Sequence, residues 1–305
     1  KAIAVEWMAK RKWVASYRVK VEAYFNNDVF PWIGSRDADT LEAADFLAIA
    51  RRIEERGSLE TAHRTTKKCG EVMRYAVATQ RAKRNPVPDL QGALAPVEKG
   101  HFAAITKPDD LAPFLRALHG YRGTPMTRAA LKLAPLVFVR PIELRTAEWS
   151  EFDLDAAQWN VPASKIKTRI PLLVPLARQA VEILRELHPL TGRGRYVFAG
   201  VRTPKRPMSS NTVLAAIRAL GYDKAAATGH GFRATARTIL DEKLKFRPDI
   251  IDHQLAHVVK DTNGRAYNRT AFIEDRIAMM QRWADYLDEL RTAPPAAGGA
   301  SSKGP

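Results

Sequence analysis

Cysteine and long apolar runs are almost missing from this sequence. Cys69 is the single cysteine in 305 residues, which excludes an intramolecular disulfide and a zinc site built from cysteines. The longest apolar stretch, residues 133–139, is much shorter than the roughly 20 residues of a membrane-spanning helix, and no signal-peptide pattern occurs. We therefore expect a soluble, cytoplasmic protein with no membrane partner.

Acidic residues are scarce relative to basic ones. The chain has 49 Lys and Arg against 33 Asp and Glu, a net charge of +16. This excess indicates a polyanionic partner, and nucleic acid is favoured over an acidic membrane. The hydrophobic share of 46% is ordinary for a globular protein, and the length is sufficient for two cores.

The lone thiol is not expected to do chemistry. Cys69 lies in residues 65–80, where Val72, Tyr75 and Ala76 recur at helical spacing. This pattern indicates a buried structural cysteine rather than a catalytic nucleophile.

Residues 1–84 are predicted to form a helical DNA-binding domain. Its second helix is expected to begin at Asp39 or Thr40 and to stop at Gly57, and a third helix follows Ser58. The third helix has a basic face that is predicted to contact DNA phosphates, although an ordinary solvated surface would look the same. The residues of this face are Arg64, Lys67, Lys68 and Arg74.

Residues 85–100 are rich in proline and glycine without periodicity, which predicts an interdomain linker. A second domain is expected over residues 101–291. Residues 292–305 contain mainly Pro, Gly, Ala and Ser and are predicted to be a disordered tail.

The second domain is predicted to mix helices with a small antiparallel sheet. Three short strand-like runs are separated by turns, and the last two enclose Lys167 in a hairpin. The remaining segments have helical spacing, and Pro141 is well placed at the start of a helix that runs to Trp149. The predicted strands are 152–154, 159–161 and 172–176, and the predicted helices include 109–118 and 127–139.

Histidines and an arginine are the first candidates for chemistry. His230 and Arg233 are three residues apart, so on a helix they share one face. His253 and His257 resemble the helical His-Glu-x-x-His zinc site, but the second position is Gln254, which cannot act as a general base, and no third ligand follows at a useful spacing. If these histidines did bind zinc, the protein would be a zinc protease. Because the general base and the third ligand are missing, we predict no metal, and we predict no cofactor either.

Tyr267 is the candidate nucleophile. Its neighbours at three and four positions are polar or small, namely Asn263, Gly264 and Thr270, whereas a core tyrosine usually has apolar ones. Arginine, histidine and tyrosine together are sufficient to hold a phosphodiester, neutralise its transition state and attack it covalently.

Several boxes in order give this chain a specific resemblance. It is similar to the tyrosine recombinases, and among them to the integrases of P4-type prophages and genomic islands. The resemblance covers nearly the whole chain. The matching boxes are Val139 to Arg145 with Trp149, Trp159 to Pro175, His230 to Arg233, Gln254 to His257, Ala266 to Arg269 and Met280 to Leu287.

The resemblance implies catalytic roles. Arg140 and Arg233 match the arginines that hold the scissile phosphate, a task suited to planar guanidinium groups. Lys167 matches the lysine that protonates the departing 5′ oxygen. His257 matches the residue that hydrogen-bonds the phosphate.

His230 matches the histidine that assists deprotonation of the nucleophile, and Tyr267 matches the nucleophile itself. A 3′-phosphotyrosine ester would conserve the energy of the broken bond, so neither ATP nor a metal is expected. The resemblance also implies a mainly α architecture, a helical core-binding domain joined to a mixed α/β catalytic domain.

The implied partners are double-stranded DNA attachment sites and three further copies of the chain, in a tetramer on paired sites. An accessory directionality or host bending factor and a location in the bacterial nucleoid belong to the same expectation. The chain departs from relatives at Leu172, where many of them have a histidine. Relatives also begin with a small arm-binding domain that is not visible in this sequence, and whether one precedes Lys1 stays open.

Alternatives remain open at this point. A type IB topoisomerase-like enzyme would share the nicking and rejoining chemistry without synapsis, and a recombinase-derived DNA-binding protein would not cleave. The apolar residues from Phe272 to Leu287 recur at helical spacing. This terminal helix is expected either to dock on a neighbouring subunit or to pack on its own domain.

Overall fold

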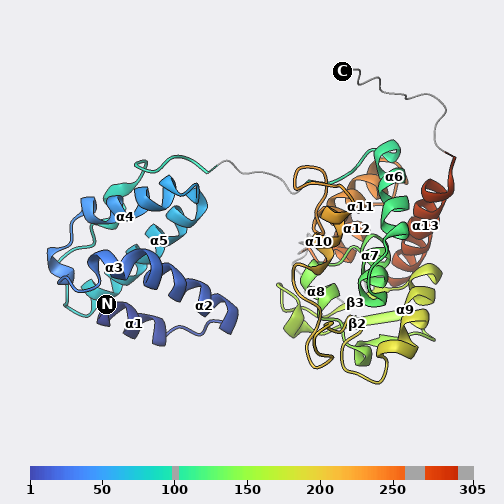
Figure 1. The fold of residues 1–305 in the computed structure, drawn as a ribbon, viewed down its shortest axis with the longest axis horizontal. Helices are drawn as coiled ribbons and strands as arrows, with labels where there is room; N and C mark the ends of the chain where they lie inside the picture. Colours follow the sequence, from blue (N-terminus) through green and yellow to red (C-terminus); the bar gives the residue numbers. More distant parts are fainter. Residues whose placement is uncertain (98–102, 258–271, 295–305) are drawn as a thin grey trace, which may run out of the picture. The chain divides into compact units, whose positions relative to one another are not determined.

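The computed structural model describes residues 1–97, 103–257 and 272–294. The chain divides into two compact units, Lys1–Gly100 and His101–Pro305 (Figure 1). The first is helical, and the second is mainly helical with one small sheet, as predicted. Within the described residues, no helix is both long enough and apolar enough to cross a bilayer.

Helices alone build the first unit. The chain begins with two short helices, continues through a π-helical segment and a further short helix, and then forms two longer helices that supply nine of the 20 buried core residues. The elements are α1 (Ala2–Ala9), α2 (Ala15–Tyr24), a π-helix (Phe25–Val29), α3 (Phe30–Ile33), α4 (Ala43–Glu55) and α5 (Leu59–Ala78).

Helix α4 begins later than its sequence suggests. Glu42 is its N-cap, and a capping box pairs Glu42 with Asp45, whose Oδ2 accepts the Glu42 N–H at 2.9 Å. The earlier polar residues instead form a 3₁₀ turn (Ala38–Thr40) whose cap is Asp37. The predicted start at Asp39 or Thr40 was therefore wrong. The predicted stop is confirmed, because Gly57 has φ of +73°.

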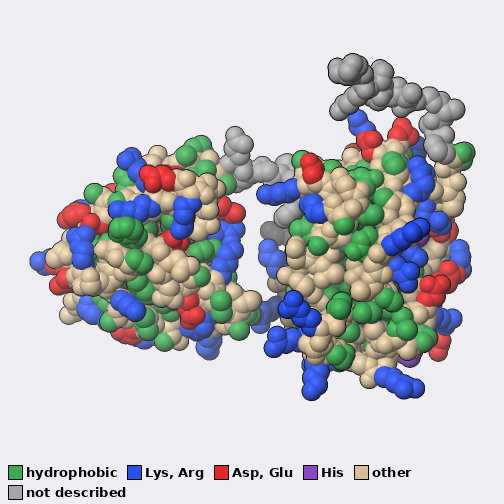
Figure 2. Space-filling model, viewed as in Figure 1, with side chains coloured by type: hydrophobic (Ala, Val, Ile, Leu, Met, Phe, Trp, Pro, Cys, Tyr) green, Lys and Arg blue, Asp and Glu red, His purple; other side chains and the backbone are tan. Residues whose placement is uncertain are grey.

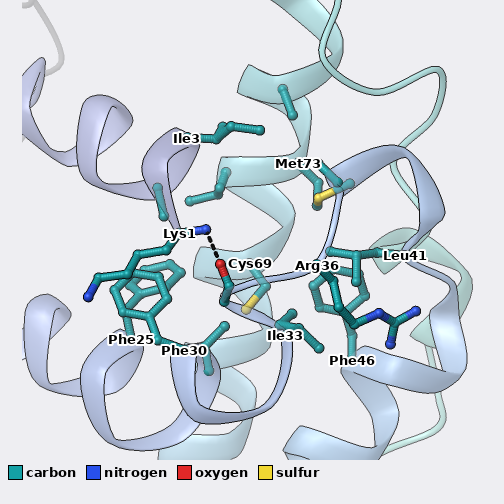
Figure 3. A pocket seen from close by; sticks show the side chains of 16 residues that line it. Lys1, Ile3, Phe25, Phe30, Ile33, Arg36, Leu41, Phe46, Cys69 and Met73 are labelled. Carbon is teal, nitrogen blue, oxygen red and sulfur yellow. Dashed lines mark hydrogen bonds between the residues drawn. The ribbon is translucent and has the colours of Figure 1, made fainter.

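Cys69 lies in the core of the first unit. Together with Ile33, Leu41, Phe46 and Met73 it lines a mainly apolar pocket (Figure 3). Burial raises the pKa of its thiol to about 12, so the thiolate is not populated near neutral pH. The prediction of a structural cysteine is confirmed.

Part of the predicted linker is packed structure. A 3₁₀ turn (Val87–Leu90) buries both of its end residues against α4 and α5. The side chain of Asn85 donates to the Gly70 carbonyl at 3.2 Å, and the Ala95 N–H donates to a side-chain oxygen of Glu54 at 3.2 Å. Composition alone did not predict this packing. Prolines interrupt a helix, but the residues around them can still pack against neighbouring helices.

In the second unit, helix α7 (Pro125–Val137) is largely buried and packs against most of the other helices. Its small sheet has the order β1-β2-β3, fully antiparallel, with Asn160 opposite Leu173. The predicted strands are thus confirmed. The elements are α6 (Pro108–Gly120), α7 (Pro125–Val137), α8 (Pro141–Arg145), β1 (Phe152–Asp153), β2 (Gln158–Val161), β3 (Leu172–Pro175), α9 (Arg178–Thr191), α10 (Thr212–Ala219), α11 (Gly231–Glu242), α12 (Pro248–Gln254) and α13 (Ile273–Thr292).

Helix α8 is shorter than predicted. It ends at Arg145 rather than Trp149, because the Trp149 N–H donates to the carbonyl of Arg195, at 3.0 Å, instead of to a helical partner. A bridge between Glu148 and Tyr196 continues this pairing. A long-range backbone contact has therefore replaced the last helical turn.

The terminal helix α13 packs on its own unit. It lies against α6 and α7 (Figure 1), and the buried indole of Trp283 donates from Nε1 to the Pro135 carbonyl at 2.9 Å. Met279, Met280 and Leu287 are also buried, whereas Ile277 is exposed. Packing in cis is thus the outcome for this helix. The predicted tail after it lies almost wholly outside the described residues.

Candidate active site

Three elements of the second unit meet at a cluster of basic side chains. Arg140 is the N-cap of α8, His230 is the N-cap of α11, and Arg233 lies in the first turn of α11. His257 follows the end of α12. Four of the six predicted catalytic residues thus come from segments that converge on one place, although up to 117 positions separate them in the chain, from 140 to 257.

The Arg233 guanidinium is buried and held by backbone carbonyls. Its Nη1 donates to the Phe138 carbonyl at 3.1 Å and its Nη2 to the Leu255 carbonyl at 2.7 Å. The same Nη2 lies 3.4 Å from Nε2 of His257. Carbonyls orient the fork without neutralising it, so its positive charge remains available to an anion.

Arg140 is positioned by a buried carboxylate. Glu143 is 1% exposed, and its Oε1 accepts from Nη1 of Arg140 at 2.9 Å while its Oε2 accepts the Arg140 backbone N–H at 2.8 Å. Pro141 starts the helix between them, with its ring φ suited to the first turn. Sequence reasoning missed Glu143, although an acidic side chain at the third helical position is a known capping signal.

Positive charges and burial shift the pKa values in the cluster. Burial, followed by the charge of Arg140, lowers the pKa of Arg233 to about 10, so this guanidinium stays charged at neutral pH. Burial, then Arg233 and Arg140, lower the pKa of His230 below its ordinary value. Neutral imidazole at position 230 is therefore favoured, and neutral imidazole is the form that accepts a proton.

His257 is oriented through its other ring nitrogen. Its Nδ1 lies 3.0 Å from Oδ1 of Asp252, and that carboxylate also pairs with Arg237. This contact fixes the ring so that Nε2 faces Arg233. Nothing in the sequence marks Asp252, since a single acidic residue on a short helix has no distinguishing pattern, and the structure places it half-buried.

The two lysines of the β2–β3 hairpin have different surroundings. Lys165 donates to the Thr146 carbonyl at 2.6 Å and pairs with Glu148 at 2.9 Å and with Glu151. Lys167 is exposed in the turn and makes no hydrogen bond or ion pair with any residue that the structure describes. Lys165 is thus committed to holding the hairpin, whereas Lys167 is available to a ligand.

Tyr267 lies outside the described residues, which stop at His257 and resume at Phe272. The described residues contain no cluster of three or more side chains suited to a metal ion.

The predicted DNA-binding residues of α5 differ in availability. Lys67 and Arg74 are exposed and have no polar side-chain partner in the described ranges. Arg64 is exposed but lies 2.5 Å from Glu60. Lys68 is only 14% exposed, pairs with Glu71 at 2.8 Å and faces aromatic rings. A role in phosphate contact is therefore favoured at Lys67 and Arg74 and disfavoured at Lys68.

Charge on the surface is uneven. In the view of Figure 2, Lys and Arg lie along the lower end of the second unit and on its left and right edges, and the acidic side chains visible on that unit lie at its top and right edge. The hairpin between α9 and α10 contributes exposed basic side chains. They are Arg202, Lys205 and Arg206.

Comparison with known proteins gives consistent matches over both units. Residues 1–93 match the family model of the phage integrase central domain, and residues 106–273 match that of the phage integrase family. The integrase of Enterobacteria phage P4 is 39% identical over 306 residues, covering 95% of this chain and 69% of the relative. Prophage integrase IntZ of Escherichia coli (strain K12) is 38% identical, covering 95% and 71%.

Solved structures share the fold. A lambda integrase dimer bound to a COC′ core site superposes with a TM-score of 0.67 at 18% identity, over 88% of this chain and 97% of that one. The Tn1549 transposon integrase in complex with transposon right end DNA gives a TM-score of 0.63 at 13% identity, over 91% and 98%.

Proposed function

The chain belongs to the phage integrase family of site-specific tyrosine recombinases, and from this premise we propose that it cleaves and rejoins attachment-site DNA through a bond between Tyr267 and a 3′ phosphate. The observation that carries the proposal is the convergence of Arg140, His230, Arg233 and His257. Such a cluster is suited to one phosphate group.

In this mechanism the two arginines bind the nonbridging oxygens of the scissile phosphate. Their guanidinium groups are fixed beforehand by Glu143 and by the carbonyls of Phe138 and Leu255. Donors that are already oriented need no reorganisation as negative charge builds up in the pentacoordinate transition state. His257 adds a further contact from its Nε2 side.

Proton transfer is assigned to two other residues. His230, whose pKa is lowered, accepts the phenolic proton of Tyr267 as the phenolate oxygen attacks phosphorus. Lys167 donates a proton to the 5′ oxygen as the P–O bond breaks; its position suits this role, because it is exposed in the hairpin and no described residue pairs with it. The reverse transfers accompany rejoining.

We propose double-stranded DNA attachment sites as the substrate and a homotetramer on two sites as the active assembly. Solved lambda integrase complexes include a dimer on a core site and a tetramer on a Holliday junction. Lys67 and Arg74 in the first unit are the phosphate contacts of this chain that we favour. We also propose that an accessory directionality or bending factor sets the balance between integration and excision. Because the proposed substrate is DNA, the protein would act in the bacterial nucleoid.

The test is covalent capture. The substrates are DNA duplexes from both junctions of the genomic element that encodes the chain. Each duplex is nicked so that the strand released by cleavage diffuses away, and it is incubated with the protein in excess EDTA. We expect a denaturant-resistant adduct at one sequence. EDTA should not reduce it, because no step of the proposed mechanism uses a metal. Absence of an adduct in spite of specific binding would favour a non-cleaving protein. Relaxation of supercoiled plasmid without sequence preference would favour the topoisomerase-like alternative.

A further inference from the structure

Arg276 is fully buried and has no acidic partner among the described residues. It lies in the first turn of α13, with none of its surface exposed. Its Nε and Nη2 donate to Oε1 of Gln254 at 3.0 and 2.6 Å, and Nη2 also donates to the carbonyl of Leu173. A single guanidinium group therefore connects β3, α12 and α13.

Each of these three elements leads to part of the proposed active site. Leu173 lies in β3, whose hairpin with β2 carries Lys167. Gln254 ends α12, and the next residue supplies the carbonyl that holds Arg233. His257 follows two residues later. In sequence, the segment with Tyr267 runs between α12 and α13, so Arg276 is at its downstream end.

The burial of Arg276 is unfavourable for the stability of the fold. Burying a charge without a counterion is unfavourable, and an apolar side chain would fill the same space. Burial lowers the pKa of Arg276 to about 10, so the group is still charged at neutral pH. In the described part of the chain, Nη1 of Arg276 and Nε2 of Gln254 are buried without a hydrogen-bond partner. Such exceptions to satisfied burial concentrate at functional sites.

We propose that Arg276 is a positioning residue that fixes the Lys167 hairpin and the end of α12 relative to each other, so that the general acid and the phosphate-binding residues reach one DNA strand together. The inference rests on the proposed recombinase chemistry. Arg276 acts through Leu173 and Gln254 and does not touch DNA. Its neighbour on the same helix, Arg282, provides a matched comparison because it forms an exposed pair with Glu289 at 2.8 Å.

The experiment compares Arg276→Met with Arg282→Met on the suicide duplex that gives an adduct with the unaltered protein. Thermal unfolding, DNA affinity by gel shift and the single-turnover rate at saturating DNA are measured for both variants. We expect Arg276→Met to bind DNA normally and to form the adduct about 10- to 100-fold more slowly, the range expected for misplaced catalytic groups. Arg282→Met is expected to behave like the unaltered protein.

A second substrate separates positioning from general loss of structure. With a 5′-bridging sulfur the leaving group needs no proton, so Arg276→Met is expected to recover part of its rate on that duplex. Arg276→Lys, which keeps the charge but not the fork, is expected to remain slow on ordinary DNA. A partly unfolded protein would lose rate equally on both duplexes.

Three outcomes would overturn the proposal: Arg276→Met as fast as Arg282→Met, a slowdown that only matches its unfolded fraction, or no recovery with the sulfur substrate. Should Arg276→Met fail to fold, Gln254→Met removes the shared acceptor at similar volume and must show the same pattern, or the proposal is wrong. If the unaltered protein forms no adduct on either junction, it is the proposed function that has failed, before any variant is compared.

Discussion

Glu143 binds Arg140 twice, through the backbone N–H at 2.8 Å and through the guanidinium Nη1 at 2.9 Å. The first contact caps α8, and the second aims a side chain assigned to the scissile phosphate. One buried carboxylate therefore serves both the local structure and the site.

Replacing Glu143 should affect stability and catalysis together. Glu143→Ala removes the cap and leaves Arg140 without its partner, so we expect the free energy of unfolding to fall by about 2 kcal/mol and adduct formation to slow by about 10-fold or more. Urea unfolding and single-turnover cleavage measure the two effects. Glu182→Ala, on the exposed face of α9, is the control. Unchanged cleavage in Glu143→Ala would show that Arg140 needs no such support.

Tyr267→Phe should abolish the covalent adduct while DNA binding persists, because only the attacking oxygen is lost and binding comes from dispersed basic residues. Denaturing gels and gel shifts distinguish the two properties. Tyr196→Phe in the same unit serves as the control and should still form the adduct. A persistent adduct in Tyr267→Phe would move the nucleophile to another residue.

The two hairpin lysines should respond differently to alanine substitution. Lys167→Ala is expected to leave the melting temperature unchanged and to slow cleavage of ordinary DNA far more than that of DNA with a 5′-bridging sulfur. Lys165→Ala breaks the contacts with Glu148 and Glu151, so it should lower the melting temperature. Equal slowing of Lys167→Ala on both substrates would remove Lys167 from the general-acid role.

Acid should weaken the fold partly through His119. Burial, then the charges of Arg291 and Lys132, lower the pKa of this imidazole from 6.5 to about 4. Since the unfolded chain binds the proton more readily, the contribution of His119 to stability is complete above about pH 6.5 and is lost as the pH falls towards 4. Melting temperatures at pH 7 and 4.5 should therefore diverge less in His119→Gln than in the unaltered protein. An identical divergence would contradict the burial of this group.

Truncation after Arg276 should prevent folding of the second unit. It removes Trp283 and its hydrogen bond to Pro135, together with the apolar face that packs on α6 and α7. The free energy lost with several buried side chains exceeds the usual free energy of unfolding of a domain. Near-ultraviolet circular dichroism and urea unfolding would record it. A chain that ends at Thr292 keeps this face and is expected to fold. A folded shorter chain that binds single sites but not paired sites would favour docking in trans.

Local pattern was sufficient for much of the fold. Gly57 as a left-handed helix stop, the three strands and the helical spacing of α5 depend on a few neighbouring residues, and each is as predicted. Boundaries failed where a distant partner intervened. At Trp149 the carbonyl of Arg195 took the backbone N–H, and Val87 is buried against α4 and α5.

The sequence by itself determined the candidate residues. His230 and Arg233 are close along the chain, and the sequence motifs occur in the same order as in the family that they resemble. Only the tertiary structure decided which side chains support them. Glu143, Asp252 and Arg276 became visible through contacts, two of which span 22 and 103 positions in the chain, from Arg276 to Gln254 and to Leu173. Periodicity reports the environment of one helix or strand. The partner of a buried charge depends on which elements pack together, and that is set by the whole core.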